Sequence, residues 1–526
     1  MTNEKQAALH REYGLLGAII VIQMLIMLWF GAQKVGYHVD EYWTYGLANH
    51  YGGKTMELQE GVPYQADEIF LDYLTVAPEH AFDYENVWNN QREDVHPPFY
   101  YVLIHTICSL MPGVFSKWVG IAVNMVCLLF ADLLLYQLAK ELFGRIDFSL
   151  VTTALFGCSL CTVNMVLFIR MYALLTIAFL ALALLFCRYY PKKSLDLRFC
   201  LLLWGIAVCG TMTQYYFLIY LFFLCLFFGV HLLVDRRWRD TARYMGALGA
   251  AGAACILIFP DMVRQIFGGS NRGKQAFESL AAKGSYGGYL KEYYGIINEQ
   301  LFCRAFPAVL VVLLALLLAA ICRKGVGRIE AGKLSRSRWA MLAFGVGGYF
   351  FLVVKIAPYR TLRYIMPISG IFLLFVLYLI LWSAQRAFGR KTARRLFLAA
   401  ALAFCCVILF GYGEIGIAYT YQETDAYVQA ASCHRDKGAV YVYNKKWKIP
   451  ASSRELEQYQ EYVFVKKAGL REFIAESKEQ PLIVYLMKDM DNEELIQEIY
   501  QGNAWFTKHE KLYENTYANV YCFYGG

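Results

Sequence analysis

The chain alternates long apolar segments with short polar loops. Most of these segments approach the roughly 20 apolar residues that an α-helix needs to cross a bilayer. Eleven candidate spans can be marked, at residues 13–32, 117–139, 148–168, 171–189, 198–213, 215–234, 243–261, 303–322, 339–356, 363–384 and 395–413. The pattern predicts an α-helical polytopic membrane protein with a membrane domain over residues 1–413.

Composition agrees with this prediction. The chain has 526 residues, of which 58% are hydrophobic, 16% aromatic and only 17% charged, which lies outside the usage of soluble globular proteins. We expect no cleaved signal peptide, because the first span lacks a small-residue cleavage site and is long enough to stay as an anchor.

Lysine and arginine set the expected orientation, because cytoplasmic loops retain them. With the N-terminus inside, every second loop is basic, through Lys140 and Arg145; Arg188, Lys192, Lys193 and Arg198; Arg236, Arg237, Arg239 and Arg243; Arg323, Lys324, Arg328, Lys333, Arg336 and Arg338; and Arg386, Arg390, Lys391, Arg394 and Arg395. The net charge of +8 therefore reflects membrane insertion. It does not indicate nucleic-acid binding, since no basic groove with stacking aromatics is evident.

This orientation requires that residues 97–112 do not cross the membrane. The segment (PPFYYVLIHTICSLMP) is apolar but short, which suits an interfacial or re-entrant helix. Counting it as a span would invert all later loops and place the basic clusters outside. We therefore predict a juxtamembrane helix there.

Three extracytoplasmic segments follow from this topology: a first loop over residues 33–116, a second over 262–302, and a soluble tail over 418–526. In the tail, Ala439–Tyr443, Pro481–Met487 and Asn519–Tyr524 are expected strands, and Thr424–Asp436 and Asn492–Gln501 are expected helices. A small α/β domain is the prediction. Its two cysteines, Cys433 and Cys522, are candidates for a disulfide or for free thiols, because this compartment permits either.

Ionisable and polar groups collect near the outer membrane surface, where they are costly without a role. They form five groups: Asp40 and Glu41; Asp94 and His96; Arg170 and Tyr172; Gln214, Tyr215 and Tyr216; and Lys355, Arg360, Arg363 and Tyr364. Each group has a structural alternative. Asp40 could cap a helix over 41–49, Asp94 or His96 could cap the interfacial helix, and the arginines could be anchors that snorkel to the interface. A single active site explains all five groups together.

Three strings carry a family resemblance: Asp40-Glu41 after the first span, Asp94-Val95-His96-Pro97-Pro98 before a juxtamembrane helix, and Arg363-Tyr364-Ile365-Met366-Pro367 before a late span. Over about residues 10–385 the chain resembles the GT-C glycosyltransferases, closest to the protein O-mannosyltransferase and aminoarabinose transferase branch (family 39/83-like). The resemblance implies a GT-C fold of about 11 transmembrane helices with juxtamembrane helices. The tail after residue 413 lies outside it.

The resemblance also implies an activity, namely inverting transfer of a sugar from a polyprenyl-phosphate-linked donor to an acceptor at the extracytoplasmic face of the plasma membrane. Asp40 inherits the role of base or acceptor-positioning group. Glu41 and Asp94 are the further catalytic candidates. Arg170, Lys355, Arg360 and Arg363 would bind the donor phosphate, because a leaving phosphate favours cations. His96, Tyr172, Tyr364 and Gln214 would line the substrate pocket.

Expected partners are the lipid-linked donor, membrane lipids and an acceptor that is a glycan, a lipid or a protein. A protein acceptor is doubtful, because no acceptor-peptide domain is inserted between spans, only the loop 262–302. No metal or other cofactor is expected, since enzymes of this kind with monophosphate donors resemble metal-independent transferases. Asp40, Asp94 and His96 are nevertheless chemically able to hold a divalent ion.

Two alternatives from other classes remain. A transporter or lipid flippase would need ionisable groups at mid-bilayer or an internal repeat, whereas the spans here are nearly free of such groups except for Asp132. A non-catalytic protein that binds lipid-linked glycans or assists assembly would keep the arginines but tolerate the loss of Asp40.

Overall fold

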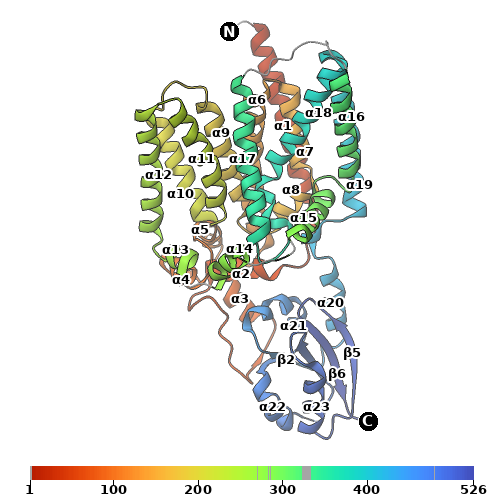
Figure 1. Ribbon diagram of the computed structural model, residues 1–526. Helices are drawn as coiled ribbons and strands as arrows, with labels where there is room; N and C mark the ends of the chain where they lie inside the picture. Colours follow the sequence, from red (N-terminus) through yellow and green to blue (C-terminus); the bar gives the residue numbers. More distant parts are fainter. Residues whose placement is uncertain (1–2, 269–270, 282–283, 285, 323–332, 479) are drawn as a thin grey trace. The chain divides into compact units, whose positions relative to one another are not determined.

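The computed structural model describes residues 3–268, 271–281, 284, 286–322, 333–478 and 480–526 (Figure 1). The chain forms two compact units. The membrane unit comprises Met1–Phe30, Val95–Tyr100 and Ile121–Ile417. The loop–tail unit comprises Gly31–Asp94, Tyr101–Gly120 and Ala418–Gly526, so the first loop and the C-terminal tail belong to one body.

The membrane unit is a bundle of long apolar helices. Within the described residues, eight helices are long and apolar enough to cross a membrane. They are α1 (Asn3–Gln33), α6 (Lys117–Phe143), α9 (Tyr172–Tyr189), α11 (Phe217–Val234), α12 (Trp238–Ile258), α17 (Lys333–Ile356), α18 (Met366–Phe388) and α19 (Arg390–Glu414). The predicted polytopic helical fold is thus confirmed.

Of the remaining three expected spans, one is bent and two are short. Residues 148–168 form α7 (Ile146–Gly157) and α8 (Leu160–Leu167), which meet at an angle of 54°. The break has a local cause, because the hydroxyl of Ser159 caps α8 by accepting the amide of Thr162 at 3.2 Å. α10 (Leu197–Thr213) and α16 (Phe306–Cys322) have 17 residues each and fall just short of a full span.

Helix α18 lies at the centre of this bundle and packs against α7, α9, α16 and α19. Another close helix pair is α11 with α17, where Gly345 and Gly348 of α17 face Leu224 and Phe223 of α11. A Cβ at either glycine would collide with these side chains, so the glycines permit the close approach. The second loop contributes α13 (Asp261–Val263), η2 (Arg264–Gly268), α14 (Asn271–Ala281) and α15 (Tyr286–Gln300).

The loop–tail unit contains a six-stranded sheet in the order β1-β3-β2-β4-β6-β5. Its strands are β1 (Pro63–Tyr64), β2 (Gly438–Tyr443), β3 (Tyr462–Lys466), β4 (Leu482–Met487), β5 (Lys508–Glu514) and β6 (Ala518–Tyr524). β2 runs parallel to β3 and β4, whereas β6 runs antiparallel to β4 and β5. The expected strands at β2, β4 and β6 are confirmed, while β1, β3 and β5 were not predicted.

Alternation along the strands gives the sheet two different faces. Val440, Val442 and Val484 join an aliphatic core with α22 (Leu470–Glu476) and α23 (Asn492–Gly502). Intervening residues such as Tyr441 and Tyr485 stack on the opposite face, with ring centroids 5.5 Å apart. One side of the sheet is therefore aliphatic and the other is rich in tyrosine.

The first loop joins this sheet directly. β1 pairs antiparallel with β3, with Pro63 opposite Val463. The loop also forms α2 (Val39–Asn49), α3 (Glu68–Leu74), η1 (Pro78–His80), α4 (Tyr84–Glu93) and α5 (Phe99–Cys108). α5 is the expected juxtamembrane helix, and its 10 residues are too few to span a bilayer. Cys433 and Cys522 are both free thiols.

Gly46 offers a test of packing in the loop–tail unit. A Cβ at this position of α2 would collide with the ring of Tyr73, whose side chain is buried and donates a hydrogen bond to the carbonyl oxygen of Lys54 at 3.0 Å. Alanine normally stabilises a helix by about 1 kcal/mol over glycine. We expect Gly46→Ala instead to lower the free energy of unfolding by about 1–3 kcal/mol, because overpacking outweighs helix propensity.

Thermal unfolding of the purified protein in detergent measures this effect. Gly295→Ala in α15 is the matched control, because nothing lies within 4 Å of a Cβ there. That variant is expected to be as stable as the wild type or slightly more stable. A Gly46→Ala protein that matches this control would contradict the close contact with Tyr73.

Candidate active site

The acid pair that follows the first span lies at the start of α2. His38 caps this helix: its Nδ1 accepts the amide of Asp40 at 3.0 Å, and its own amide donates to the Glu41 carboxylate at 2.6 Å. The alternative in which Asp40 caps the helix is wrong, because His38 fills that position. Asp40 is instead in the first turn, where the helix dipole stabilises a carboxylate.

Glu41 is fully buried and forms an ion pair with Lys34 at 3.0 Å. Lys34 is equally buried and also donates to the carbonyl oxygen of Tyr419 at 2.8 Å. Burial lowers the pKa of the Lys34 ammonium, while Glu41 acts in the opposite direction. Through Lys34, Glu41 therefore connects the start of α2 to the tail, which is a structural role. The catalytic role predicted for Glu41 stays a prediction.

Asp40 is the more accessible acid of the pair, with 28% of its side chain exposed. Its Oδ2 lies 3.7 Å from Nδ1 of His38. Because that nitrogen already accepts the Asp40 amide, it carries no proton to donate to the carboxylate. A carboxylate held in this way at a helix start can accept a proton from a substrate hydroxyl.

Asp94 closes α4 rather than opening α5. It is the C-cap residue of α4, where its amide donates to the carbonyl oxygen of Gln91 at 3.2 Å. The alternative in which Asp94 caps the juxtamembrane helix is therefore wrong, since α5 begins only at Phe99. Asp94 is half-buried and ends one segment of the loop–tail unit, and Val95 begins a segment of the membrane unit.

In the membrane unit the structure brings together His96 and Arg170. Nη2 of Arg170 lies 3.3 Å from Nε2 of His96, and since arginine only donates, the imidazole is the acceptor. Arg170 is 3% exposed and lies in the short break between α8 and α9. This contact links the His-Pro-Pro string to an arginine far away in sequence.

A buried network holds the chain just before Arg170. Asn124 of α6 donates to the carbonyl oxygens of Val166 and Phe168, both at 3.0 Å. Tyr100 in turn donates to the amide oxygen of Asn124 at 3.0 Å. Sequence reasoning missed Asn124 and Tyr100; the available signal was an asparagine within the apolar first half of a span.

Arg360 and Arg363 lie among aromatic rings before α18. The guanidinium carbon of Arg360 is 3.8 Å from the ring centroid of Tyr289 in α15, and that of Arg363 is 5.2 Å from Tyr364. Both arginines are half-buried. Residues 362–364 form the short helix η3 that leads into α18. The second loop thus covers the arginine string through α15.

Tyrosines join this cluster from several helices. Tyr349 of α17 donates to the carbonyl oxygen of Tyr364 at 2.8 Å, and the rings of Tyr216 and Tyr364 are 5.4 Å apart. Burial raises the pKa of the Tyr293 hydroxyl in α15, while the charges of Arg360 and Arg363 act in the opposite direction. The structure therefore places the predicted residues Tyr172, Tyr364, Arg360 and Arg363 in one cluster. Tyr289, Tyr293 and Tyr349 were not predicted, because nothing in the sequence shows that α15 and α17 meet there.

Two further candidates have different surroundings. The side-chain oxygen of Gln214 accepts the amide of the adjacent Tyr215 at 2.8 Å, which is a local contact. Lys355 lies in the last turn of α17 and is half-buried. In the part of the chain that the structure describes, no three His, Cys, Asp or Glu side chains are grouped to hold a metal ion. The expectation that transfer needs no metal stays a prediction.

Comparisons with known proteins find a matching family model and solved structures of similar fold. A family model of dolichyl-phosphate-mannose-protein mannosyltransferases matches residues 95–263. A search of curated proteins finds no match. Among solved structures, apo ArnT from Cupriavidus metallidurans is similar, with a TM-score of 0.55 and 11% identity over 97% of this chain and 98% of that one.

Two further structures have lower scores. ArnT from Cupriavidus metallidurans bound to undecaprenyl phosphate has a TM-score of 0.49 at 12% identity, over 97% of this chain and 98% of that one. The apo oligosaccharyltransferase from Archaeoglobus fulgidus also has 0.49, at 10% identity, over 97% of this chain and 74% of that one.

The likeness to apo ArnT shows a common fold, and the family model covers the segment that contains His96 and Arg170. The fold and the family match over residues 95–263 both agree with the resemblance to GT-C glycosyltransferases that the sequence motifs carry.

The buried ion pair supplies a stability prediction. Glu41→Gln leaves the Lys34 ammonium buried without its anion, and breaking a buried pair in this way costs about 3–5 kcal/mol. We expect a lower melting temperature for purified Glu41→Gln protein in detergent. The double variant Lys34→Met/Glu41→Gln should recover part of the loss, because it buries no charge and the glutamine can still accept the His38 amide. Equal stability of Glu41→Gln and wild type would contradict a structural ion pair.

Proposed function

We propose that this chain transfers a sugar, with inversion, from a polyprenyl-phosphate-linked donor to an acceptor hydroxyl at the extracytoplasmic face of the plasma membrane. The observation that carries the proposal is the difference in burial between the two adjacent acids. The Glu41 carboxylate is held in a buried ion pair, whereas the Asp40 carboxylate, in the first turn of α2, is partly exposed. Asp40 is therefore the acid of the pair that a substrate can reach.

The proposed step needs one base. Asp40 takes the proton of the acceptor hydroxyl as its oxygen attacks the anomeric carbon from the face opposite the phosphate. The bond between that carbon and the phosphate oxygen breaks, and its electron pair leaves with the polyprenyl phosphate. The leaving phosphate is already a stable anion, so the reaction requires no general acid and no metal. Glu41 supports the start of α2 in this mechanism, and Asp94 would shape the acceptor pocket.

Cations on the membrane unit stabilise the departing phosphate in this proposal. Arg170 is held by a buried network, and Arg360 and Arg363 are held among tyrosines. Arginine suits this task because its planar group can bind two phosphate oxygens at once. Lys355 would add charge nearby, and His96, Tyr172, Tyr364 and Gln214 would contact the sugar. The description of the matching family, which names a dolichyl-phosphate-linked sugar, supports this class of donor.

The proposed orientation rests on the basic loops, which place the N-terminus in the cytoplasm and the loop–tail unit outside. The lipid donor would reach the arginines from the bilayer.

Replacing Asp40 tests the chemical step. We expect Asp40→Asn to lower transfer by a factor of about 10²–10⁴, because the amide cannot accept the hydroxyl proton, while protein abundance and melting temperature stay near wild type. Surface glycans of cells that lack the gene are compared by mass spectrometry after complementation with wild type or variant. Asp72→Asn is the control, since Asp72 is an exposed acid in the same loop, with 76% of its side chain exposed.

If Asp40→Asn restores the glycan that the deletion removes, Asp40 is not the base. In that case a non-catalytic protein for lipid-linked glycan binding or assembly, or a lipid transporter, explains the chain better.

Replacing Arg363 tests the donor site. We expect Arg363→Ala to weaken the binding of undecaprenyl phosphate to the purified protein by about 10–100-fold, since a hydrogen bond to a charged group contributes about 1.5–3 kcal/mol. Arg363→Lys should fall between alanine and wild type, because lysine lacks the planar two-point contact. Native mass spectrometry measures the bound lipid, and Arg390→Ala at the exposed start of α19 is the control. Unchanged lipid binding in Arg363→Ala would remove this arginine from the phosphate site.

A further inference from the structure

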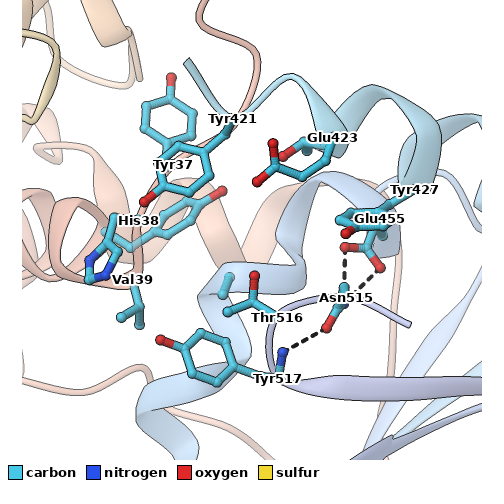
Figure 2. Close-up of a pocket in the computed structure, with 13 residues that line it drawn as sticks. Tyr37, His38, Val39, Tyr421, Glu423, Tyr427, Glu455, Asn515, Thr516 and Tyr517 are labelled. Atoms are coloured by element: carbon cyan, nitrogen blue, oxygen red, sulfur yellow. Dashed lines mark hydrogen bonds between the residues drawn. The ribbon is translucent and has the colours of Figure 1, made fainter. Parts of the chain in front are cut away.

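The loop–tail unit contains a pocket that the proposed chemistry does not use. Five tyrosines surround it: Tyr37, Tyr42, Tyr421, Tyr427 and Tyr517, and we refer to it as the tyrosine pocket. Figure 2 shows Tyr37, Tyr421 and Glu423 on one side of this space, and Glu455 with Asn515 on another. The first loop and the tail both contribute walls, so the pocket exists only because these segments fold together.

The aromatic side of the pocket is held in a defined arrangement. The rings of Tyr37 and Tyr42 lie 5.2 Å apart, and the hydroxyl of Tyr42 lies 2.9 Å from the hydroxyl of Ser453, with which it is hydrogen-bonded. Tyr421 has a φ of +52°, a backbone conformation that non-glycine residues rarely adopt. Its ring lies over the ammonium of Lys34, with the nitrogen 5.2 Å from the centroid. Such strain persists only where surrounding contacts enforce it, and it is frequent at binding sites.

The polar side of the pocket presents acids and an amide. Glu455 is 2% exposed and accepts hydrogen bonds from Asn515 at 2.9 and 3.0 Å and from the hydroxyl of Tyr513 at 3.0 Å. Burial raises the pKa of Glu455 to about 7, so near neutral pH it is partly protonated and can both donate and accept. Glu423, at the start of α20 (Glu423–Ser432), is exposed at the rim.

This chemistry selects a class of ligand. The acid at Glu423 and the partly ionised Glu455 disfavour phosphate and other anions by charge repulsion. Aromatic faces beside hydrogen-bonding carboxyl and amide groups match a neutral sugar, which has apolar C–H faces and hydroxyl edges. The cavity itself measures about 30 Å³, which is room for a water molecule or a single hydroxyl group. A sugar would therefore lie across the mouth and insert one hydroxyl.

The pocket also adjoins the proposed base. His38 lines it, and the same imidazole lies 3.7 Å from the carboxylate of Asp40. A ligand at the mouth would thus sit beside the first turn of α2. We propose that the tyrosine pocket is an acceptor subsite for a neutral sugar residue, and hence that the acceptor is a carbohydrate chain or the glycan of a glycolipid. This inference rests on the proposed transferase function for its role, although sugar binding can be measured without transfer.

Binding of the purified full-length protein in detergent to a printed array of neutral oligosaccharides, acidic oligosaccharides and peptides tests the proposal. We expect the wild type to bind neutral oligosaccharides. Tyr427→Ala and Glu423→Gln should each weaken this binding by about tenfold, which corresponds to roughly 1.4 kcal/mol. Tyr427→Phe keeps the ring and should bind within about threefold of wild type, which corresponds to roughly 0.65 kcal/mol. Glu472→Gln is the matched control, since Glu472 is exposed on α22, which covers the other face of the sheet.

Absence of neutral-sugar binding, binding to peptides only, or equal binding by Tyr427→Ala and wild type would overturn the proposal. Asp40→Asn keeps these two proposals separable. Retained sugar binding with lost transfer in that variant supports both. Retained transfer would remove Asp40 as the base, while the effect of Tyr427→Ala on binding would still decide the pocket.

Discussion

A buried ion pair between Lys34 and Glu41 organises the part of the molecule that carries the proposed base. Lys34 directly follows the first membrane helix, and its ammonium is buried. A buried charge without a partner would be very unfavourable. The Glu41 carboxylate pairs with this ammonium. The same carboxylate accepts the His38 amide and so completes the cap of α2. Lys34 reaches the tail as well, through the carbonyl oxygen of Tyr419. This one ion pair therefore joins the residue that follows α1, the start of α2 and the beginning of the tail.

This arrangement explains why two adjacent acids have different tasks. On a helix, neighbouring positions point in directions about 100° apart, so Glu41 can face the interior while Asp40 faces outward. The membrane unit shows a similar division of labour. The side chains of Asn124 and Tyr100 form hydrogen bonds that hold the chain before Arg170. Arg170 itself contacts His96. In both units, buried polar groups hold the backbone beside a charged residue of the predicted site.

The tail is an integral part of the loop–tail unit, since β1 of the first loop extends its sheet and Tyr42 of α2 is hydrogen-bonded to Ser453 of the tail. Because the tail is built into the first loop, residues of the tail lie next to the start of α2. The tyrosine pocket lies at this place, and its walls come from both the first loop and the tail.

Hydrophobic length and loop charge in the sequence were enough to predict the helical membrane fold and the short α5, because bilayer thickness imposes a length on every span. Alternation predicted β2, β4 and β6. The motifs indicated a resemblance to the GT-C glycosyltransferases, with which the fold agrees. The tertiary structure alone decided the bend between α7 and α8, the strands β1, β3 and β5, the identity of His38 as the cap, and the burial of Glu41. It also decided that tyrosines from α15 and α17 surround Arg360 and Arg363. These features depend on contacts between residues distant in sequence, and no local pattern of polarity records which distant segments will meet.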